Sequence, residues 1–411
     1  MPPFLNGDPE VSTLIEREAQ RLQDTIDLIA AENHPPPSIL AAQGSPFAVK
    51  AAEGYPGHRY HAGCENVDAL EQLALDRCRT LFGAEHANVQ PHSGVAANLA
   101  VYFAVLEVGD RVLSMQLSHG GHLSHGAPVS MTSRCFDFAH YGVDAASGCI
   151  DYDAVATLAA KWHPKMIVAG ASSYPRLIDY QQLSKIADQN AAFLMVDMAH
   201  IAGLVAAGVI PSPVPHADFV TFTTYKTLRG GRGGVILCKQ PYAERIDRSV
   251  FPGCQGTPSM NSIAAKAVCF QQATSSDFKA LQRQTLANAR CMAEIFADRG
   301  YRVISGGTDN HLVLMDLRSK GVSGGWAEEQ LEKVGLIVNR NPIPGHQNAA
   351  GIEDGLRLGT PAISSRGMRE PEARRIAEWV DTVLTNSGQQ RILTGIREKV
   401  AALCRSFPIP D

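Results

Sequence analysis

The chain has 411 residues, of which 45% are hydrophobic and 19% are charged, and its formal net charge is −4 at pH 7. This length and composition are typical of a globular protein with a large buried core, and the lack of a basic block or of an apolar run of about 20 residues argues against nucleic-acid or membrane partners. Nine scattered cysteines without a C-x-x-C pair, and a beginning (MPPFLNGDPEVS) without a signal-peptide pattern, predict reduced thiols and a cytoplasmic protein.

The first two thirds of the chain alternate amphipathic helices with short apolar strands. The spacing of apolar residues predicts helices over residues 66–83, 93–106 and 183–190. Apolar runs predict strands over residues 165–170, 192–200, 218–225 and 233–239. Strands and helices that alternate in this way predict an α/β fold, with a mostly parallel sheet covered by helices on both faces.

After about Ser275 the pattern changes. A long helix is predicted over residues 277–299, followed by strands over 310–317 and 334–339 and an amphipathic helix over 370–384. We interpret this part as a smaller α+β domain. The expected organisation is an N-terminal helical arm (residues 1–45), a large domain (46–276) and a small C-terminal domain (277–411).

Two of the predicted strands end in side chains that can carry chemistry. Asp197 closes the strand in VDMAH, and Lys226 follows the strand in DFVTFTTYK. In open α/β sheets, ligands bind at the carboxyl ends of the strands. A lysine at that edge can form a Schiff base with an aldehyde, and a buried carboxylate can pair with a pyridine nitrogen, as pyridoxal phosphate (PLP) enzymes require.

A third feature fits the same cofactor. Ser93 and Gly94 open a predicted helix, where a hydroxyl and backbone N–H groups would bind a phosphate. Taken singly, Ser93 and Asp197 are equally well explained as helix N-caps. Their order along the chain together with Lys226 favours a PLP site.

The segment HGGHLSHG offers a competing interpretation. His119, His122 and His125 lie within seven residues of one another and could bind a metal ion. Compact zinc motifs usually add cysteine or a carboxylate at a recognisable spacing, and no H-E-x-x-H occurs here. We therefore expect no metal site, and instead an imidazole stacked on a flat cofactor ring.

A series of motifs runs through the chain: EGYPGHRYHAGCENVDALE, ANVQPHSG, HGGHLSHGAPV, VDMAHIAGLVAAGV, TLRGGRGG, FPGCQGTP and SGGTDNHLVLMDL. With these motifs in this order, the chain resembles the serine hydroxymethyltransferase family over nearly its whole length. The resemblance implies a fold-type-I PLP-dependent transferase, similar to aspartate aminotransferase, with a seven-stranded sheet. It also implies tetrahydrofolate as a co-substrate.

The resemblance also implies roles for the residues that match the family's motifs. Lys226 matches the lysine that binds the cofactor covalently, Asp197 the partner of the pyridine nitrogen, and His122 the stacked ring. The implied cofactor site comprises Ser93, Gly94, His122, Ser172, Asp197, His200, Lys226 and, from a neighbouring subunit, Gly256. The implied catalytic residues, with Glu53 as acid and base across a dimer interface, are Lys226, Glu53, His122, Asp197, Tyr60 and Thr223.

Substrate and folate sites are implied in the same way. Arg357 matches the arginine that clamps the substrate carboxylate, and a surface salt bridge is the alternative. The implied substrate-binding residues are Arg357, Glu53, His61, Ala31, Ala51, Tyr225 and Arg232. The implied folate-binding residues, among which core packing is the alternative for the leucines, are Leu117, Gly121, Leu123, Phe251 and Asn341.

The sequence departs from the family's pattern around the substrate. Ala31 stands in place of a serine and Ala51 in place of a tyrosine. His61 replaces a second tyrosine, Tyr225 a histidine, and Val95 a small polar residue. Because these changes remove hydroxyls and a large ring while the cofactor residues stay intact, we hypothesise an altered substrate. It would be an α-substituted serine, as in an α-methylserine hydroxymethyltransferase, or a β-hydroxy amino acid with a larger side chain.

The leading hypothesis is a PLP-dependent hydroxymethyltransferase that cleaves serine or such an analogue by retro-aldol chemistry and passes the one-carbon unit to tetrahydrofolate. The alternative is a folate-independent β-hydroxy-amino-acid aldolase or transaldolase on the same scaffold. A non-catalytic relative would be expected to have lost Lys226 or Asp197, and both are present. The resemblance implies a homodimer with shared active sites and leaves open whether dimers pair into tetramers.

Overall fold

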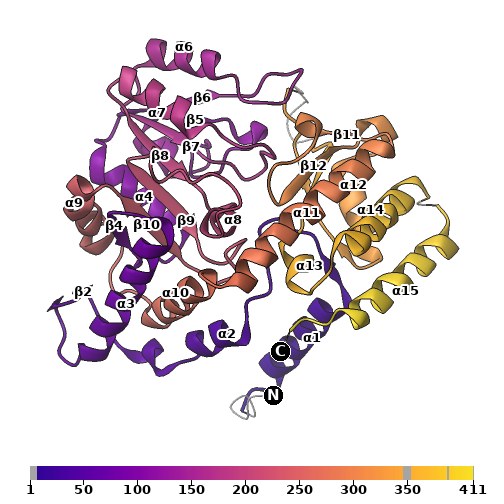
Figure 1. Cartoon of the computed structure of the whole chain (residues 1–411), viewed down its shortest axis with the longest axis horizontal. Helices are drawn as coiled ribbons and strands as arrows, with labels where there is room; N and C mark the ends of the chain where they lie inside the picture. The colour runs from indigo at the N-terminus through magenta and orange to yellow at the C-terminus, as the bar shows by residue number, and fades with distance from the viewer. Residues whose placement is uncertain (1–6, 346–352, 387, 411) are drawn as a thin grey trace.

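The computed structural model describes residues 7–345, 353–386 and 388–410. The chain forms two lobes, a larger one built on a seven-stranded sheet and a smaller one built on a four-stranded sheet. The long helix α11 (Ser276–Asp298) runs between the two lobes and follows α10 (Met260–Ala273) of the large lobe (Figure 1).

The seven-stranded sheet has the strand order β4–β10–β9–β8–β7–β5–β6. Strands β5 to β9 pair in parallel, whereas β10 runs antiparallel to both β9 and β4. The bounds are β4 (His86–Asn88), β5 (Arg111–Met115), β6 (Asp137–Tyr141), β7 (Met166–Ala169), β8 (Phe193–Asp197), β9 (Phe219–Thr223) and β10 (Gly234–Cys238). The mostly parallel sheet predicted from the sequence is therefore confirmed.

Helices cover both faces of this sheet, as expected. Along β8, Leu194 and Val196 belong to one apolar core and Met195 to another, because successive strand side chains point to opposite faces. The first core includes residues of α2 (Pro37–Gln43), α3 (Glu65–Phe82), α6 (Tyr152–Trp162), α7 (Tyr180–Gln189), α8 (Ala202–Ala206) and α10. The second includes residues of α4 (Gly94–Val105) and α9 (Ala243–Arg248). Burial on both faces explains why these strands are almost continuously apolar.

The small lobe has an antiparallel sheet in the order β11–β12–β15–β14. Its strands are β11 (Arg302–Val303), β12 (Leu312–Asp316), β14 (Asn339–Asn341) and β15 (Gly355–Gly359). A separate apolar core includes residues of α11, α12 (Gly324–Lys333), α13 (Pro361–Ser365), α14 (Glu370–Thr385) and α15 (Gln390–Ser406). The expected change of architecture after about residue 275 is thus observed.

One predicted strand of the small lobe was wrong in detail. The run 334–339 is not one strand, because the chain changes its pairing partner at Val338. Before that residue, β13 (Leu336–Ile337) pairs in parallel with β1 (Ile26–Asp27), and after it β14 pairs with β15. Apolar periodicity alone carries no signal for such a change of partner.

The N-terminal segment links the two lobes. Helix α1 (Pro9–Asp24) packs against α15 and is followed by β1, so both belong with the small lobe, whereas α2 packs against α10 of the large lobe. Between them, residues 28–36 pass between the two lobes (Figure 1), where Ala30 and His34 are buried. The domain boundaries at residues 45 and 276 stay predictions.

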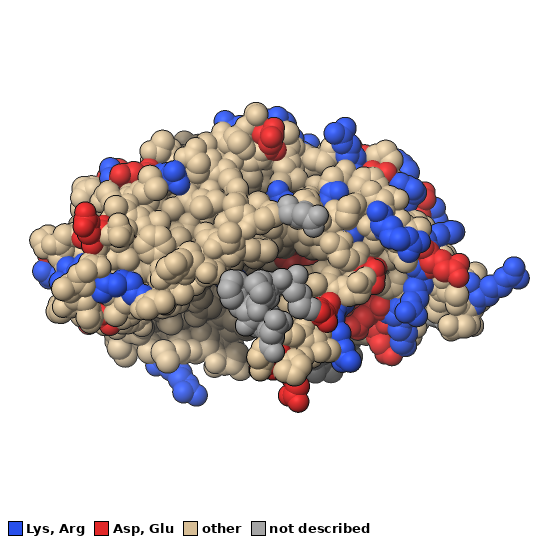
Figure 2. Space-filling model, turned by 90° about the horizontal axis from the view of Figure 1, so that it is seen from below, with Lys and Arg blue, Asp and Glu red and all other residues tan. Residues whose placement is uncertain are grey.

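Within the described ranges, none of the helices combines the length and apolarity needed to cross a bilayer. Figure 2 shows one face, on which Lys and Arg gather mainly over the end of the molecule formed by the small lobe and the surface is hollowed near its centre. All nine cysteines are free thiols.

Candidate active site

An open cavity lies at the carboxyl ends of β8 and β9, the edge of the sheet where ligands bind in α/β proteins. It collects residues from five separate parts of the sequence. The lining residues are Ser93, Gly94, Val95, His122, His125, Ala171, Ser172, Asp197, Ala199, His200, Thr223, Tyr225 and Lys226. The three features that the sequence placed far apart, Ser93–Gly94, Asp197 and Lys226, therefore share one cavity.

Asp197, at the end of β8, is held by a buried hydrogen-bond network. Its Oδ2 accepts from Asn98 Nδ2 at 2.8 Å and lies 3.2 Å from His125 Nε2, and its Oδ1 accepts from the Ala199 backbone N–H at 3.0 Å. Burial by itself would raise the pKa of Asp197, but the hydrogen bond and charge of His125, with the Asn98 bond, lower that pKa below its usual value. The carboxylate therefore stays anionic in a buried place.

Three residues of this network, Asn98, His125 and Thr221, were missed as site residues by sequence reasoning. Thr221 Oγ1 donates to Asn98 Oδ1 at 2.6 Å, which turns the amide so that its Nδ2 faces Asp197. His125 was considered only as a metal ligand. Its position in the HGGHLSHG loop is a usable signal, whereas Asn98 lies on an apolar helix and gives none.

Lys226 follows β9 and is 7% exposed. Burial, with a smaller effect of the nearby Arg357 and Arg232 charges, lowers the pKa of Lys226 to about 8, although Asp197 acts in the opposite direction. About a tenth of the amine is therefore uncharged at pH 7, far more than for an ordinary lysine, which favours its use as a nucleophile. Asn33 Nδ2 donates to the Lys226 carbonyl at 3.0 Å, a contact from the N-terminal segment that the sequence did not reveal.

Tyr225 and Val95 are the two substituted residues that line the cavity directly. The guanidinium carbon of Arg232 lies 4.5 Å from the centroid of the Tyr225 ring, and Lys226 Nζ lies 5.9 Å from it. Cation–π contacts of this kind hold a ring and a cation in a fixed relative position. Tyr225 and Arg232 thus act as one unit at the cavity wall.

Ser93 and Gly94, which also line the cavity, suit a phosphate. Ser93 is the N-cap of the 12-residue helix α4, and its Oγ accepts from the Ala96 N–H at 3.1 Å, so the N-cap interpretation and the phosphate interpretation are compatible. A Cβ added to Gly94 would come within 2.7 Å of Thr223 Cγ2. The backbone at this position is therefore open only because residue 94 is glycine, and its N–H remains accessible to an anion.

His122 also lines this cavity. Burial lowers its pKa to about 4, so the ring is neutral at physiological pH. The ligand atoms of His122, His125 and Asp197 lie within 4.8 Å of one another, which would geometrically allow a metal ion. Asp197 Oδ2 is already engaged by Asn98 and His125, however, so the donor set fits a flat cofactor with a pyridine nitrogen better than a metal.

The small lobe contributes Arg357, on β15. Its Nη1 donates to the Ser172 carbonyl at 2.7 Å and its Nε to Asn339 Oδ1 at 3.0 Å. Burial lowers the pKa of Arg357 to about 10, which still leaves it cationic. The alternative of a surface salt bridge is therefore wrong: Arg357 is bound to neutral groups beside a cavity residue, and its charge is available to a ligand. Ala31 is half-buried. The residue before it, Ala30, packs against Gly359 of β15, the strand that also carries Arg357.

Several predicted site residues do not line this cavity in the described chain. Glu53 precedes the hairpin of β2 (Gly54–Tyr55) and β3 (His58–Arg59), where the Thr257 hydroxyl donates to it and His61 Nδ1 lies 2.9 Å from its Oε2. Three further predicted site residues near Glu53 are exposed: Ala51, Tyr60 and Gly256. Tyr60 is 77% exposed, and its ring centroid lies 5.6 Å from that of Phe251. We call residues 50–61 and 251–257 the Glu53 segment.

The predicted folate residues are divided between the two places. Leu117 and Leu123 flank the His122 loop and are 43% and 50% exposed, so core packing is excluded for both. A Cβ on Gly121 would collide with the Met115 carbonyl, and Asn341 Nδ2 donates to Ser173 Oγ at 3.3 Å near the cavity. Phe251 belongs to the Glu53 segment. Within the described chain these five residues form no single site.

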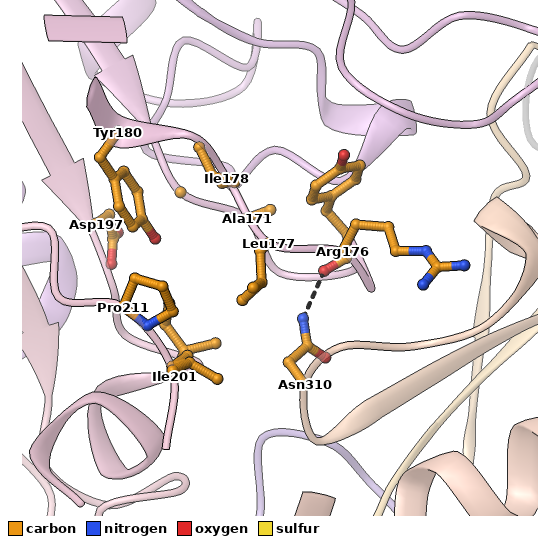
Figure 3. A pocket seen from close by; sticks show the side chains of 12 residues that line it. Ala171, Arg176, Leu177, Ile178, Tyr180, Asp197, Ile201, Pro211 and Asn310 are labelled. Atoms are coloured by element: carbon orange, nitrogen blue, oxygen red, sulfur yellow. Dashed lines mark hydrogen bonds between the residues drawn. The ribbon is translucent and has the colours of Figure 1, made fainter. Parts of the chain in front are cut away.

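A second, more enclosed cavity also borders Asp197. In Figure 3, Asp197 and Pro211 stand on one side of it, and Arg176 and Asn310 on the other. Asn310 Nδ2 donates to the Tyr174 carbonyl at 3.0 Å, the dashed contact in Figure 3. This contact ties the start of β12 in the small lobe to a loop of the large lobe.

The sequence is similar to known proteins over nearly its whole length. The family model described as serine hydroxymethyltransferase matches residues 4–380. A protein named serine hydroxymethyltransferase from Halorhodospira halophila (strain DSM 244 / SL1) is 52% identical over 404 residues, which cover 98% of this chain and 97% of that relative. The family match spans every residue that lines the main cavity, and Arg357 as well.

Proposed function

This chain belongs to the serine hydroxymethyltransferase family, and we propose that it transfers the hydroxymethyl group of serine to tetrahydrofolate with PLP as its cofactor. The single observation that carries the proposal is the cavity in which Ser93, Asp197 and Lys226 meet. The α/β architecture of the chain is accordingly that of a fold-type-I PLP enzyme.

Different residues that line the cavity fit different parts of PLP. The Lys226 amine, with its pKa of about 8, would hold the aldehyde carbon, and the Asp197 carboxylate would keep the pyridine nitrogen protonated. Ser93 and Gly94 would bind the phosphate at the helix N-terminus. When bound, PLP supplies an electron sink for the negative charge that develops at the amino acid's Cα.

The chain's own residues then bind and orient the amino acid. Arg357 offers a planar guanidinium that can bind a carboxylate through two hydrogen bonds, which a lysine cannot copy. His122 would lie against the cofactor ring as a neutral imidazole, so that it adds no competing charge. Thr223, Ser172 and His200 complete the wall of the cavity.

The decisive experiment traps the covalent bond at Lys226. The protein incubated with PLP is reduced with borohydride, digested and mapped by mass spectrometry, and Lys226 is expected to carry the reduced cofactor. Lys239, a surface lysine paired with Asp218, serves as the internal control. Modification of other lysines at the same level as Lys226 would contradict the proposal. Formaldehyde release from serine is then measured with and without tetrahydrofolate, and rapid folate-independent cleavage would favour an aldolase instead.

We also propose a homodimer in which Glu53, Tyr60 and Gly256 of each chain complete the partner's cavity. The support is that the Glu53 segment carries predicted site residues yet does not line the cavity of its own chain. Mixing two inactive variants, Lys226→Ala and Glu53→Gln, tests this. Hybrid dimers would regain one intact site, so random mixing restores about a quarter of the wild-type activity. No recovery after confirmed subunit exchange would contradict shared sites.

The native substrate is proposed to be serine or an α-substituted serine such as α-methylserine. The support lies in the substituted positions Ala31, Ala51, His61 and Tyr225. Restoring the family's residues with Ala51→Tyr and Tyr225→His is expected to shift the ratio of kcat/KM toward serine by about tenfold or more, the size of effect that one pocket group exerts on specificity. An unchanged ratio would show that these positions do not select the substrate.

We further propose that the protein works in the cytoplasm. The support is that all nine cysteines are free thiols, which reducing compartments maintain. Fractionation of cells that produce the protein, with thiol labelling before and after reduction, would test both points together.

A further inference from the structure

His311 is a buried histidine that no step of the proposed function uses. It stands just before β12, is fully buried, and its Nδ1 has no hydrogen-bond partner in the described part of the chain. The preceding residue, Asn310, donates a hydrogen bond to the Tyr174 carbonyl of the large lobe (Figure 3). A buried polar atom without a partner costs free energy and calls for an explanation.

The contacts of His311 Nε2 determine where its proton lies. Nε2 is 3.1 Å from the Ala30 carbonyl, which can only accept a hydrogen bond, so Nε2 must carry the proton. Burial and the Arg357 charge lower the pKa of His311 to about 3, so the ring is neutral and its Nδ1 carries no proton. His311 is therefore an Nε2–H tautomer.

The same Nε2 also faces His200. It lies 3.4 Å from His200 Nδ1, and the two rings are nearly parallel, with an interplanar angle of 25°. Because His311 Nε2 already carries a proton, His200 Nδ1 must be without one and accept the second branch of the hydrogen bond. Burial, followed by the charges of Lys226 and Arg357, lowers the pKa of His200, so this ring is neutral as well. Its single proton is then on Nε2.

We propose that His311 is a positioning residue that fixes the tautomer of His200, so that His200 presents an N–H donor from Nε2 to the cofactor cavity. The side chain of His200 lines that cavity, and its Nε2 makes no hydrogen bond within the described ranges. The backbone is held from behind, because Thr227 Oγ1 donates to the His200 carbonyl at 2.8 Å. The tautomer follows from protein contacts alone, and its use toward an acceptor oxygen of PLP rests on the proposed function.

The two histidines come from different lobes, which gives the contact a further consequence. His200 follows β8 of the large lobe, whereas His311 belongs to the small lobe and Ala30 to the segment between them. The donor is therefore aligned only when both lobes and this segment are in the observed arrangement. The change from serine to alanine at position 31 lies directly beside the carbonyl that orients His311.

The test compares His311→Phe with His311→Gln. Phenylalanine keeps a ring but removes the donor, whereas the glutamine amide can still donate to Ala30 and His200. Nitrogen-15 NMR of histidine-labelled protein reports the tautomer of His200, assigned by the signal that is lost in His200→Asn. Wild type and His311→Gln are expected in the Nε2–H form, and His311→Phe should contain at least about tenfold more of the Nδ1–H form.

Two outcomes would overturn the proposal: an Nδ1–H tautomer of His200 in the wild type, or an unchanged tautomer in His311→Phe. The spectra are recorded without and with PLP, so the tautomer is measured even if PLP binds elsewhere. With PLP, His311→Phe is expected to weaken binding by about fivefold, the size of one hydrogen bond, and His311→Gln to restore it. Thermal unfolding of both variants separates this effect from a general loss of stability.

Discussion

Asp197 and Glu53 are both carboxylates implied in catalysis, but they lie in opposite surroundings. The Asp197 side chain is 9% exposed, and Asn98, His125 and a backbone N–H hold its two oxygens. The Glu53 side chain is 28% exposed, and its partners are one hydroxyl of Thr257 and His61, which is itself 44% exposed. The hydrogen-bond network around Asp197 is formed within one chain, whereas the side chains around Glu53 are partly open to solvent.

The difference indicates how the site divides its work. The cavity around Asp197 must keep a charge buried and oriented before any ligand binds, which requires a hydrogen-bond network that folds with the core. The Glu53 segment has no such network in the described chain, and in the proposed dimer the partner subunit would complete its surroundings. Changes in the first region should therefore have large effects, whereas changes to the partners of Glu53, as distinct from Glu53 itself, should have small and pH-dependent ones.

The largest expected effect comes from neutralising the buried carboxylate. Asp197→Asn keeps the shape but removes the negative charge, so the pyridine nitrogen of bound PLP loses its counter-charge and kcat should fall about 1,000-fold, or about 4 kcal/mol. Steady-state assays with serine and tetrahydrofolate provide the measurement. Asp153→Asn, a matched change at an exposed carboxylate on α6, should leave kcat unchanged. A loss of less than tenfold in Asp197→Asn would contradict the assigned role.

The second prediction concerns the buried amine of Lys266. On α10 and 1% exposed, it donates to the carbonyls of Val89 (2.6 Å) and Pro91 (3.1 Å), close in sequence to Ser93 and Gly94, and to that of Gly234 (2.9 Å). Burial lowers the pKa of Lys266 from 10.5 to about 7. The unfolded chain therefore binds more protons between these two pH values, and stability rises with pH across that window.

The effect of Lys266 is measured as the free energy of unfolding of ligand-free wild type minus that of Lys266→Met. This difference should be constant below pH 7 and should increase by several kcal/mol as the pH rises toward 10.5. Lys185→Met, an exposed change on α7, provides the control and should show no such slope. A pH-independent difference for Lys266→Met would mean that the buried amine is not the titrating group.

The smallest expected effects lie in the Glu53 segment. The Thr257 hydroxyl is the main group that lowers the pKa of Glu53, and the His61 charge is a weaker one. If ionised Glu53 acts as a base, Thr257→Val should move the acid limb of the kcat/KM profile to higher pH, and His61→Phe should move it less. Activity at neutral pH should change by only about twofold, as is usual for exposed charge pairs. Thr274→Val on the surface of the large lobe is the control, and the reverse order of the two shifts would contradict this account.

Much of this architecture was accessible from local sequence. The strand over 218–225 and the helix over 66–83 were recognised because burial on one or both faces imposes a period that the sequence must carry. Lys226 and Asp197 were singled out because Asp197 ends one such strand and Lys226 lies just after another, and parallel strands bring their carboxyl ends to one edge. The motifs around them identified the family.

Other features depended on contacts between distant segments. The split at Val338 follows from pairing with β1, which lies more than 300 residues earlier in the chain. Asn98 lies on an apolar helix and meets Asp197 only in the folded chain, and Asn33 reaches the Lys226 carbonyl from the N-terminal segment. No local pattern announces such partners, because side-chain hydrogen bonds across a core leave the period of each element unchanged.

By itself, the amino-acid sequence determined the elements, the mostly parallel sheet, the family and the residues that could form a covalent bond with PLP. Tertiary structure alone decided that Asp197 stays charged, that Lys226 has a lowered pKa, and on which nitrogen His200 carries its proton. The physical reason is that periodicity and motifs are local properties of the chain. Ionisation and tautomer depend on burial and on partners that only folding brings together.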